Sequence, residues 1–326
     1  MKIIDVHAHY CPRAYYAKLE CRKAAPYVRA LKNGALDLRY GPGRSSHVRE
    51  GMYSLDRRLE DMDAKGVEVQ VLSPLLHGVH RLDPKTGLEL CRLVNDDVAE
   101  VVQKHKGRFE GFAVLPLQGV DESLMELERS VRELKMRGVI FFSNVEGHFL
   151  DEERFWPLYE RIAALDVPIF IHPTHPVNDK GMKDYGLIST LGFLYDTTLT
   201  MLRIIFSGLL EQHSRLKFIL PHLGSVVPYI TARIDKERAG PTNSQRNIQR
   251  SPSEYFKLVY VDTVSLHKPA LMMANSYLGS ARILFGCDCP FWGMGEGLES
   301  VRDLDISERD KENIFFKNAE GLLKLA

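Results

Sequence analysis

The amino-acid sequence predicts an α/β fold, the (β/α)8 TIM barrel, in which eight parallel strands alternate with helices. Eight short, mainly apolar runs recur along the 326-residue chain, and most are followed by a longer segment with helical spacing of its apolar residues. The runs are almost continuously apolar, which is typical of parallel strands buried on both faces. No shift in composition divides the chain, so we expect residues 1–326 to form one domain.

Turn residues and helix-end signals set the bounds of the expected elements. Residues 55–65 interleave charges with Leu and Met and stop at Gly66, and Asp151 precedes two glutamates that suit a helix N-terminus. The expected strands are Ile3–His7, Val67–Ser73, Phe109–Leu115, Gly138–Phe142, Pro168–His172, Lys217–Pro221, Lys257–Asp262 and Ile283–Cys287. The expected helices are Leu55–Lys65, Pro84–Lys104, Val120–Arg137, Asp151–Leu165, Thr197–Glu211, Pro228–Glu237, Pro269–Leu278 and Ser307–Leu323.

Two insertions interrupt the alternation of strands and helices. Residues 10–53 follow the first strand and contain the chain breaker Gly41-Pro42-Gly43, and residues 173–196 follow the fifth strand. Both leave the carboxyl ends of strands, where the active sites of such barrels are built. We therefore expect them to cover a pocket and to contact a substrate. Surface elaboration without function is the alternative.

Composition excludes several classes of partner. Lys and Arg total 43, equal to Asp and Glu at 43, so no net positive charge supports binding to nucleic acid or an anionic membrane. No apolar stretch is long enough to span a bilayer. Five irregularly spaced cysteines and an N-terminus without a signal peptide predict a reducing, cytoplasmic setting. Cys287 and Cys289 flank Asp288; we interpret them as small buried residues, with a thiolate site as the alternative.

Polar side chains at strand ends predict a metal site. His7 and His9 lie two residues apart in the first strand, so their rings project to the same face and can form half of a divalent-metal site. By themselves they are more often a core or surface pair than metal ligands. His172, His222 and Asp288 each end an apolar run and precede a turn residue. Strand-end residues open onto one barrel mouth, so we expect all of them to meet there.

These motifs together resemble the amidohydrolase superfamily. The resemblance is to the branch that contains aminocarboxymuconate-semialdehyde decarboxylase and the γ-resorcylate-type decarboxylases, and it extends over essentially the whole chain. It rests on residues 4–9 (IDVHAH), 59–63 (LEDMD) with Gly66-Val67, 91–97 (CRLVNDD), 107–109 (GRF), 113–116 (AVLP), Gly138-Val139, His172-Pro173, 222–224 (HLG) and 288–290 (DCP).

The resemblance implies one divalent metal ion, usually zinc with manganese as the alternative, held by His7, His9, His172 and Asp288. It also implies catalytic roles for His222 and Asp288, with His222 orienting or deprotonating a water. Relatives with two metals carry a lysine at the end of the fourth strand, and residues 139–144 (VIFFSN) contain none, which favours a single ion. Three imidazoles and a carboxylate leave a coordination position open, as catalytic sites require.

Three functions are compatible with this site. The first is a metal-dependent, non-oxidative decarboxylase of a small aromatic or unsaturated carboxylic acid. The second is a hydrolase or hydratase acting on an amide, lactone, C–C or C=C bond through the same site, because the fold does not choose between reactions. The third is a degenerate barrel that only binds a ligand, which the complete set of ligand types argues against.

Substrate-binding residues are less strongly indicated. In the resembled decarboxylases an arginine at the position of Arg233 reaches the neighbouring subunit's site and grips a carboxylate, which implies a homodimer or higher homo-oligomer. Its alternative is a salt bridge to Asp235 or a solvated helix face. An arginine and a tryptophan of the aminocarboxymuconate enzyme match Ser46 and Ser189 here, so that particular substrate is not supported. Further candidates for the pocket are Arg44, Arg49, His175 and Trp292, with His47, His77 and His80 as polar neighbours.

Overall fold

The computed structural model describes residues 1–32, 35–237 and 247–325. Its main sheet has eight parallel strands in the order β1-β5-β6-β7-β10-β11-β12-β13. The strands are β1 (Ile4–His9), β5 (Val69–Ser73), β6 (Phe109–Val114), β7 (Gly138–Phe142), β10 (Ile169–His172), β11 (Phe218–Leu220), β12 (Tyr260–Asp262) and β13 (Ile283–Leu284). The N–H of Val6 donates to Phe285 O at 2.9 Å and that of His9 to Cys289 O at 2.7 Å, which closes the barrel. The TIM barrel is confirmed.

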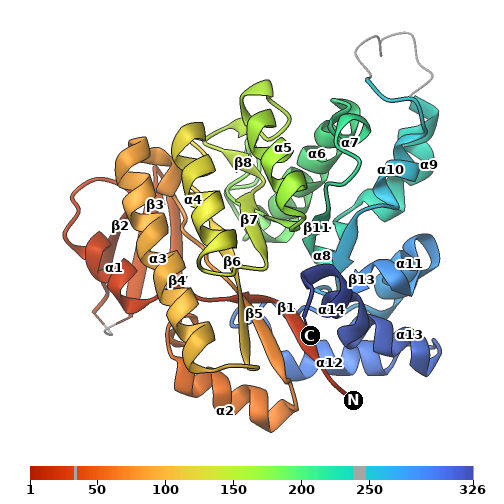
Figure 1. The fold of residues 1–326 in the computed structure, drawn as a ribbon, viewed down its shortest axis with the longest axis horizontal. Helices are drawn as coiled ribbons and strands as arrows, with labels where there is room; N and C mark the ends of the chain where they lie inside the picture. Colours follow the sequence, from red (N-terminus) through yellow and green to blue (C-terminus); the bar gives the residue numbers. More distant parts are fainter. Residues whose placement is uncertain (33–34, 238–246, 326) are drawn as a thin grey trace.

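The helices surround the barrel (Figure 1). They are α2 (Leu55–Lys65), α3 (Pro84–Lys104), α4 (Val120–Arg132), α5 (Trp156–Leu165), α6 (Phe193–Phe206), α7 (Leu209–Gln212), α9 (Val227–Glu237), α10 (Pro252–Phe256), α11 (Lys268–Leu278), α12 (Met294–Arg302), α13 (Glu308–Glu312) and α14 (Asn318–Leu323). Strand side chains fill the barrel interior; Phe112 and Phe170, for example, stack with ring centroids 5.8 Å apart. None of the helices described is long and apolar enough to cross a bilayer.

Several expected helices are shorter than the sequence pattern predicted. Residues 197–211 divide into α6 and α7 at Gly208, which has a φ of +84° and no room for a side chain, since a Cβ there would lie 2.5 Å from Asn247 O. The helix expected over 120–137 ends at Arg132, before Lys135 adopts a φ of +60°. A π-helical turn, Asn313–Lys317, separates α13 from α14. The helical pattern persists in sequence, but positive-φ residues and a π-helical turn interrupt it.

The first insertion forms a small unit beside the barrel mouth. It contains α1 (Arg13–Glu20) and an antiparallel sheet of β2 (Tyr27–Ala30), β3 (Leu36–Gly41) and β4 (Arg44–Val48) (Figure 1). Buried Arg58 of α2 ties this unit to β1, because its guanidinium donates to the backbone oxygens of His9 and Gly51. The second insertion carries a π-helical turn, Ile188–Gly192, and the start of α6. Small strands β8 (Asn144–Val145) and β9 (His148–Phe149) follow β7.

Candidate metal centre and active site

Four side chains from distant parts of the chain converge at the carboxyl end of the barrel. The ligand atoms of His7, His9, His172 and Asp288 all lie within 4.8 Å of one another. His9 Nε2 lies 3.0 Å from His7 Nε2, 3.2 Å from His172 Nε2 and 2.8 Å from Asp288 Oδ1. Strand β1 contributes two of these residues because alternate positions share a face. The structure thus brings together the four residues that the sequence singled out.

Hydrogen bonds on the far side of each ring fix how the histidines face this cluster. His7 Nδ1 pairs with Asp262 Oδ2 at 2.7 Å, His9 Nδ1 with Ser73 O at 3.2 Å and His172 Nδ1 with Pro173 O at 2.8 Å. A carbonyl or carboxylate accepts a proton from Nδ1, which leaves the lone pair of a neutral ring on Nε2. Three lone pairs therefore point at one another, an arrangement that a bound cation satisfies.

The carboxylate of the cluster completes the fit to a cation. Asp288 Oδ1 is buried, and no donor within the described residues hydrogen-bonds to it. Burial by itself raises the pKa of the Asp288 carboxyl, but His7, His222 and His9 outweigh it and hold the pKa well below its usual range. Burial, reinforced by the neighbouring histidines, lowers the pKa of His172 well below 6.5. An ionised carboxylate at Asp288 and a neutral imidazole at His172 are protonation states that divalent-metal ligands need.

A buried network behind β1 holds its two histidines in place. Asp5 accepts the backbone N–H groups of His7 and Cys287, and it also accepts the Cys287 thiol at 2.8 Å. Gln70 donates to Asp5 and accepts from Arg58. Cys287 is therefore a buried structural thiol, and neither it nor Cys289 belongs to the ligand cluster.

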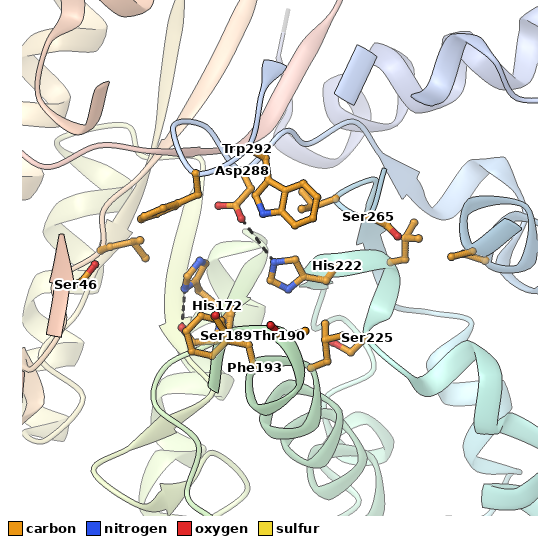
Figure 2. A pocket seen from close by; sticks show the side chains of 18 of the residues that line it. Ser46, His172, Ser189, Thr190, Phe193, His222, Ser225, Ser265, Asp288 and Trp292 are labelled. Atoms are coloured by element: carbon orange, nitrogen blue, oxygen red, sulfur yellow. Dashed lines mark hydrogen bonds and ion pairs between the residues drawn. The ribbon is translucent and has the colours of Figure 1, made fainter. Parts of the chain in front are cut away.

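His222 lies beside the cluster on an unusual turn. It sits in α8 (Pro221–Gly224) with φ 55° and ψ 51°, and Leu223 has φ 57°. Left-handed conformations cost non-glycine residues about 1–2 kcal/mol each, so tertiary contacts hold this turn. His222 Nε2 is 3.9 Å from Asp288 Oδ2. Figure 2 shows His222, His172 and Asp288 turned toward one another from three different parts of the chain.

A cavity of about 740 Å³ opens above these residues. Its wall is mainly apolar, with aromatic rings and several hydroxyl groups, and no Lys or Arg of the described chain lines it. Tyr40, Phe193, Phe291 and Trp292 supply rings, and Ser225 and Ser265 supply hydroxyls. Such a wall suits a flat organic molecule whose charged group is bound at the metal centre rather than by the walls.

Several residues singled out in the sequence do line this cavity. Trp292, with 43% of its surface exposed, stands next to Asp288 (Figure 2). Ser46 and Ser189, the positions matched to an arginine and a tryptophan in the aminocarboxymuconate enzyme, also contribute to the wall. His77 lies flat between Tyr40 and Phe142, with ring centroids 5.0 and 5.3 Å away. Residues of both insertions therefore line the pocket.

Other candidates lie off the cavity wall of a single chain. Arg49 donates to the backbone oxygens of Pro290 and Phe291, and it thereby supports the loop after β13. His175 is buried and pairs with Asp179 at 3.0 Å. Arg44 is half-buried at the start of β4, and Arg233 is exposed on α9. His47 is exposed beside Asp37, and His80 is buried near Leu115 O.

One residue of the site was not singled out by the sequence patterns. Asp262 ends β12 and contacts His7 as well as the backbone of His222. It meets the same criterion, a polar residue at the end of an apolar strand, that pointed to His172 and Asp288. That criterion applied to every strand would have found it.

Comparison with known proteins places this geometry in a family. The chain matches the amidohydrolase family over residues 4–325. It is 34% identical over 284 residues to γ-resorcylate decarboxylase from Polaromonas sp. (strain JS666), covering 83% of this chain and 87% of that relative. The crystal structure of 5-carboxyvanillate decarboxylase from Sphingomonas paucimobilis superposes with a TM-score of 0.88 and 25% identity, covering 100% of this chain and 99% of the other.

A further solved relative contains a metal. Dihydroxybenzoic acid decarboxylase from Polaromonas sp. JS666 was crystallised with bound manganese and the inhibitor 2-nitroresorcinol; its TM-score is 0.79 at 28% identity, covering 99% of this chain and 97% of the other. The family match over nearly the whole chain and the identity to the first relative agree with the His-His-His-Asp cluster. The chain therefore belongs to the amidohydrolase family.

Proposed function

We propose that this chain is a metal-dependent, non-oxidative decarboxylase of an aromatic or unsaturated carboxylic acid, and that residues 1–326 act as one catalytic domain. The observation that carries the proposal is the convergence of three imidazole Nε2 atoms and the Asp288 carboxylate, beside His222, at the floor of a cavity that no Lys or Arg of the described residues lines. Relatives named as γ-resorcylate decarboxylase and 5-carboxyvanillate decarboxylase support the reaction class.

The cluster would hold one divalent ion through His7, His9, His172 and Asp288. Zinc is our first candidate because imidazoles dominate the donor set, and manganese, which the solved relative contains, is the second. When bound, such an ion polarises a substrate oxygen and stabilises the electron pair that departing CO₂ leaves behind. The protein's own contribution is the preset direction of the three ring lone pairs, which the Nδ1 hydrogen bonds maintain.

His222 would transfer the proton that decarboxylation requires. Its Nε2 faces Asp288 at the cavity floor, where it can deliver a proton to the carbon that loses CO₂. The aromatic rings of Phe291 and Trp292 would orient a flat substrate over these two groups.

We further propose that Arg233 completes carboxylate recognition from a second copy of the chain. Among the described residues, no Lys or Arg lines the cavity of one chain. Arg233 is exposed on α9, the helix whose Pro228 lines the cavity. A guanidinium binds a carboxylate through two parallel hydrogen bonds. A homodimer or higher homo-oligomer working in the cytoplasm is the setting we propose. Arg44, Arg49 and His175 remain weaker candidates, since two of them are engaged by contacts within the chain.

The test measures CO₂ release by the metal-loaded protein and the incorporation of oxygen from water into the product. A panel of hydroxybenzoic and muconate-type acids is assayed for CO₂ release in ¹⁸O-labelled water. Release of CO₂ with no label in the ring product supports decarboxylation; label in the product without CO₂ would identify a hydrolase or hydratase. The His222→Ala variant should keep its metal and lose about 10²–10⁴-fold in kcat, the usual contribution of proton transfer by a positioned side chain. Near-normal turnover in that variant would exclude this role.

A further inference from the structure

Asp262 is a fully buried carboxylate that contacts two parts of the active site at once. Its Oδ2 pairs with His7 Nδ1 at 2.7 Å. Its Oδ1 accepts the backbone N–H of His222 at 2.8 Å and that of Val264 at 3.1 Å. One side chain therefore contacts a histidine of the metal centre and the backbone of the proposed proton-transfer residue.

The contact with His7 determines where that ring presents its lone pair. Because the Asp262 carboxylate is an acceptor, the Nδ1 proton of His7 stays on the side of Asp262 and Nε2 is left free to bind a cation. Space for this contact depends on Gly286 in the neighbouring segment. A Cβ at Gly286 would lie 2.9 Å from His7 Cβ and 3.0 Å from Asp262 Cβ, closer than side chains tolerate.

The contact with His222 stabilises the backbone of the turn at His222, where the Nδ1 atom of the His222 ring makes no hydrogen bond within the described residues. His222 and Leu223 both have positive φ, a conformation that persists only when surrounding contacts maintain it. Within the described residues, His222 Nδ1 is buried and has no hydrogen-bond partner. Because Nδ1 makes no such bond, the turn helps to direct the ring beside the ion pair of Nε2 with Asp288. Asp262 accepts the backbone N–H of His222 within this turn.

We propose that Asp262 is a positioning residue that couples the metal centre to the proton-transfer histidine through its two carboxylate oxygens. The His222 half of this proposal rests on the proposed function; the His7 half does not. Both oxygens face N–H donors, so a side-chain amide can satisfy one contact but must turn its own N–H groups toward a donor at the other.

The test compares Asp262→Asn with a matched control. Glu126→Gln removes another fully buried carboxylate, which contacts Asn95 and Arg129 on the outer helices. Zinc affinity is measured by competition with a chelator. Asp262→Asn should weaken it about 10- to 100-fold, as is usual for residues that orient a ligand histidine, and Glu126→Gln should leave it unchanged. Asp262→Glu, which keeps two acceptor oxygens, should recover part of the loss.

The His222 half has its own readout in the zinc-loaded protein. Ring ¹⁵N signals of His222, assigned by their absence from His222→Ala, should shift in Asp262→Asn, and kcat at saturating zinc should fall at least about tenfold. Unchanged zinc affinity would overturn the role of Asp262 in orienting His7 for metal binding. Unchanged His222 signals together with a normal kcat would overturn the coupling of Asp262 to His222. If the amide variant does not fold, Asp262→Ser is carried through the same measurements. If wild-type protein releases no CO₂, the proposed function fails, while zinc affinities and ring signals still decide what Asp262 does.

Discussion

Replacing His80 with phenylalanine should make the protein less sensitive to acid. His80 is buried beside Phe142, and burial lowers the pKa of its ring from 6.5 to about 4, against a weaker opposing effect of Leu115 O. At pH 5 the unfolded chain binds a proton at this ring and the folded chain does not. Stability is therefore lost as the pH falls from about 6.5 towards 4, and the loss between pH 7 and pH 5 is about 2 kcal/mol.

The assay is urea unfolding at pH 7, 6 and 5, with the free energy of unfolding obtained at each pH. Other groups also titrate in this range, so the relevant quantity is the difference between wild type and His80→Phe. Wild type should lose about 2 kcal/mol more than the variant between pH 7 and pH 5. His267→Phe places the same change at an exposed ring and serves as the control. Parallel pH dependences in wild type and His80→Phe would show that the folded ring takes up its proton at an ordinary pH.

The remaining predictions concern the metal and the substrate. His172→Ala removes one of the converging Nε2 atoms, so it should abolish both bound metal and activity; elemental analysis that finds a full equivalent of metal would contradict its assignment as a ligand. Arg233→Lys should mainly raise KM for carboxylate substrates, because an ammonium cannot form the paired hydrogen bonds of a guanidinium. Arg57→Lys, at an exposed position on α2, is the control for that change, and equal KM values in all three proteins would remove Arg233 from the site.

Patterns between near neighbours in the sequence predicted the barrel and most of the metal centre. His7 and His9 share a face because strand geometry repeats every two residues, whatever the rest of the fold does. His172 and Asp288 follow apolar runs that parallel packing sends to one rim. Helix bounds were right where the pattern registered a local break, as at Gly66 with a φ of +73°. They were wrong where it did not, as at Gly208, which has a φ of +84° and divides α6 from α7.

Contacts between segments far apart in the sequence decided the rest. The guanidinium of Arg49 is as well suited to a substrate carboxylate as that of Arg233. In the fold, however, it donates to the backbone oxygens of Pro290 and Phe291 in the loop after β13. Asp262 acquires its two partners only because β12 lies beside β11 and β13 and so brings it to His222 and His7. Residue type and spacing thus determined which groups could bind a metal. Strand order and loop packing decided which of the polar groups face it, because hydrogen-bond direction depends on neighbours that the chain meets only when folded.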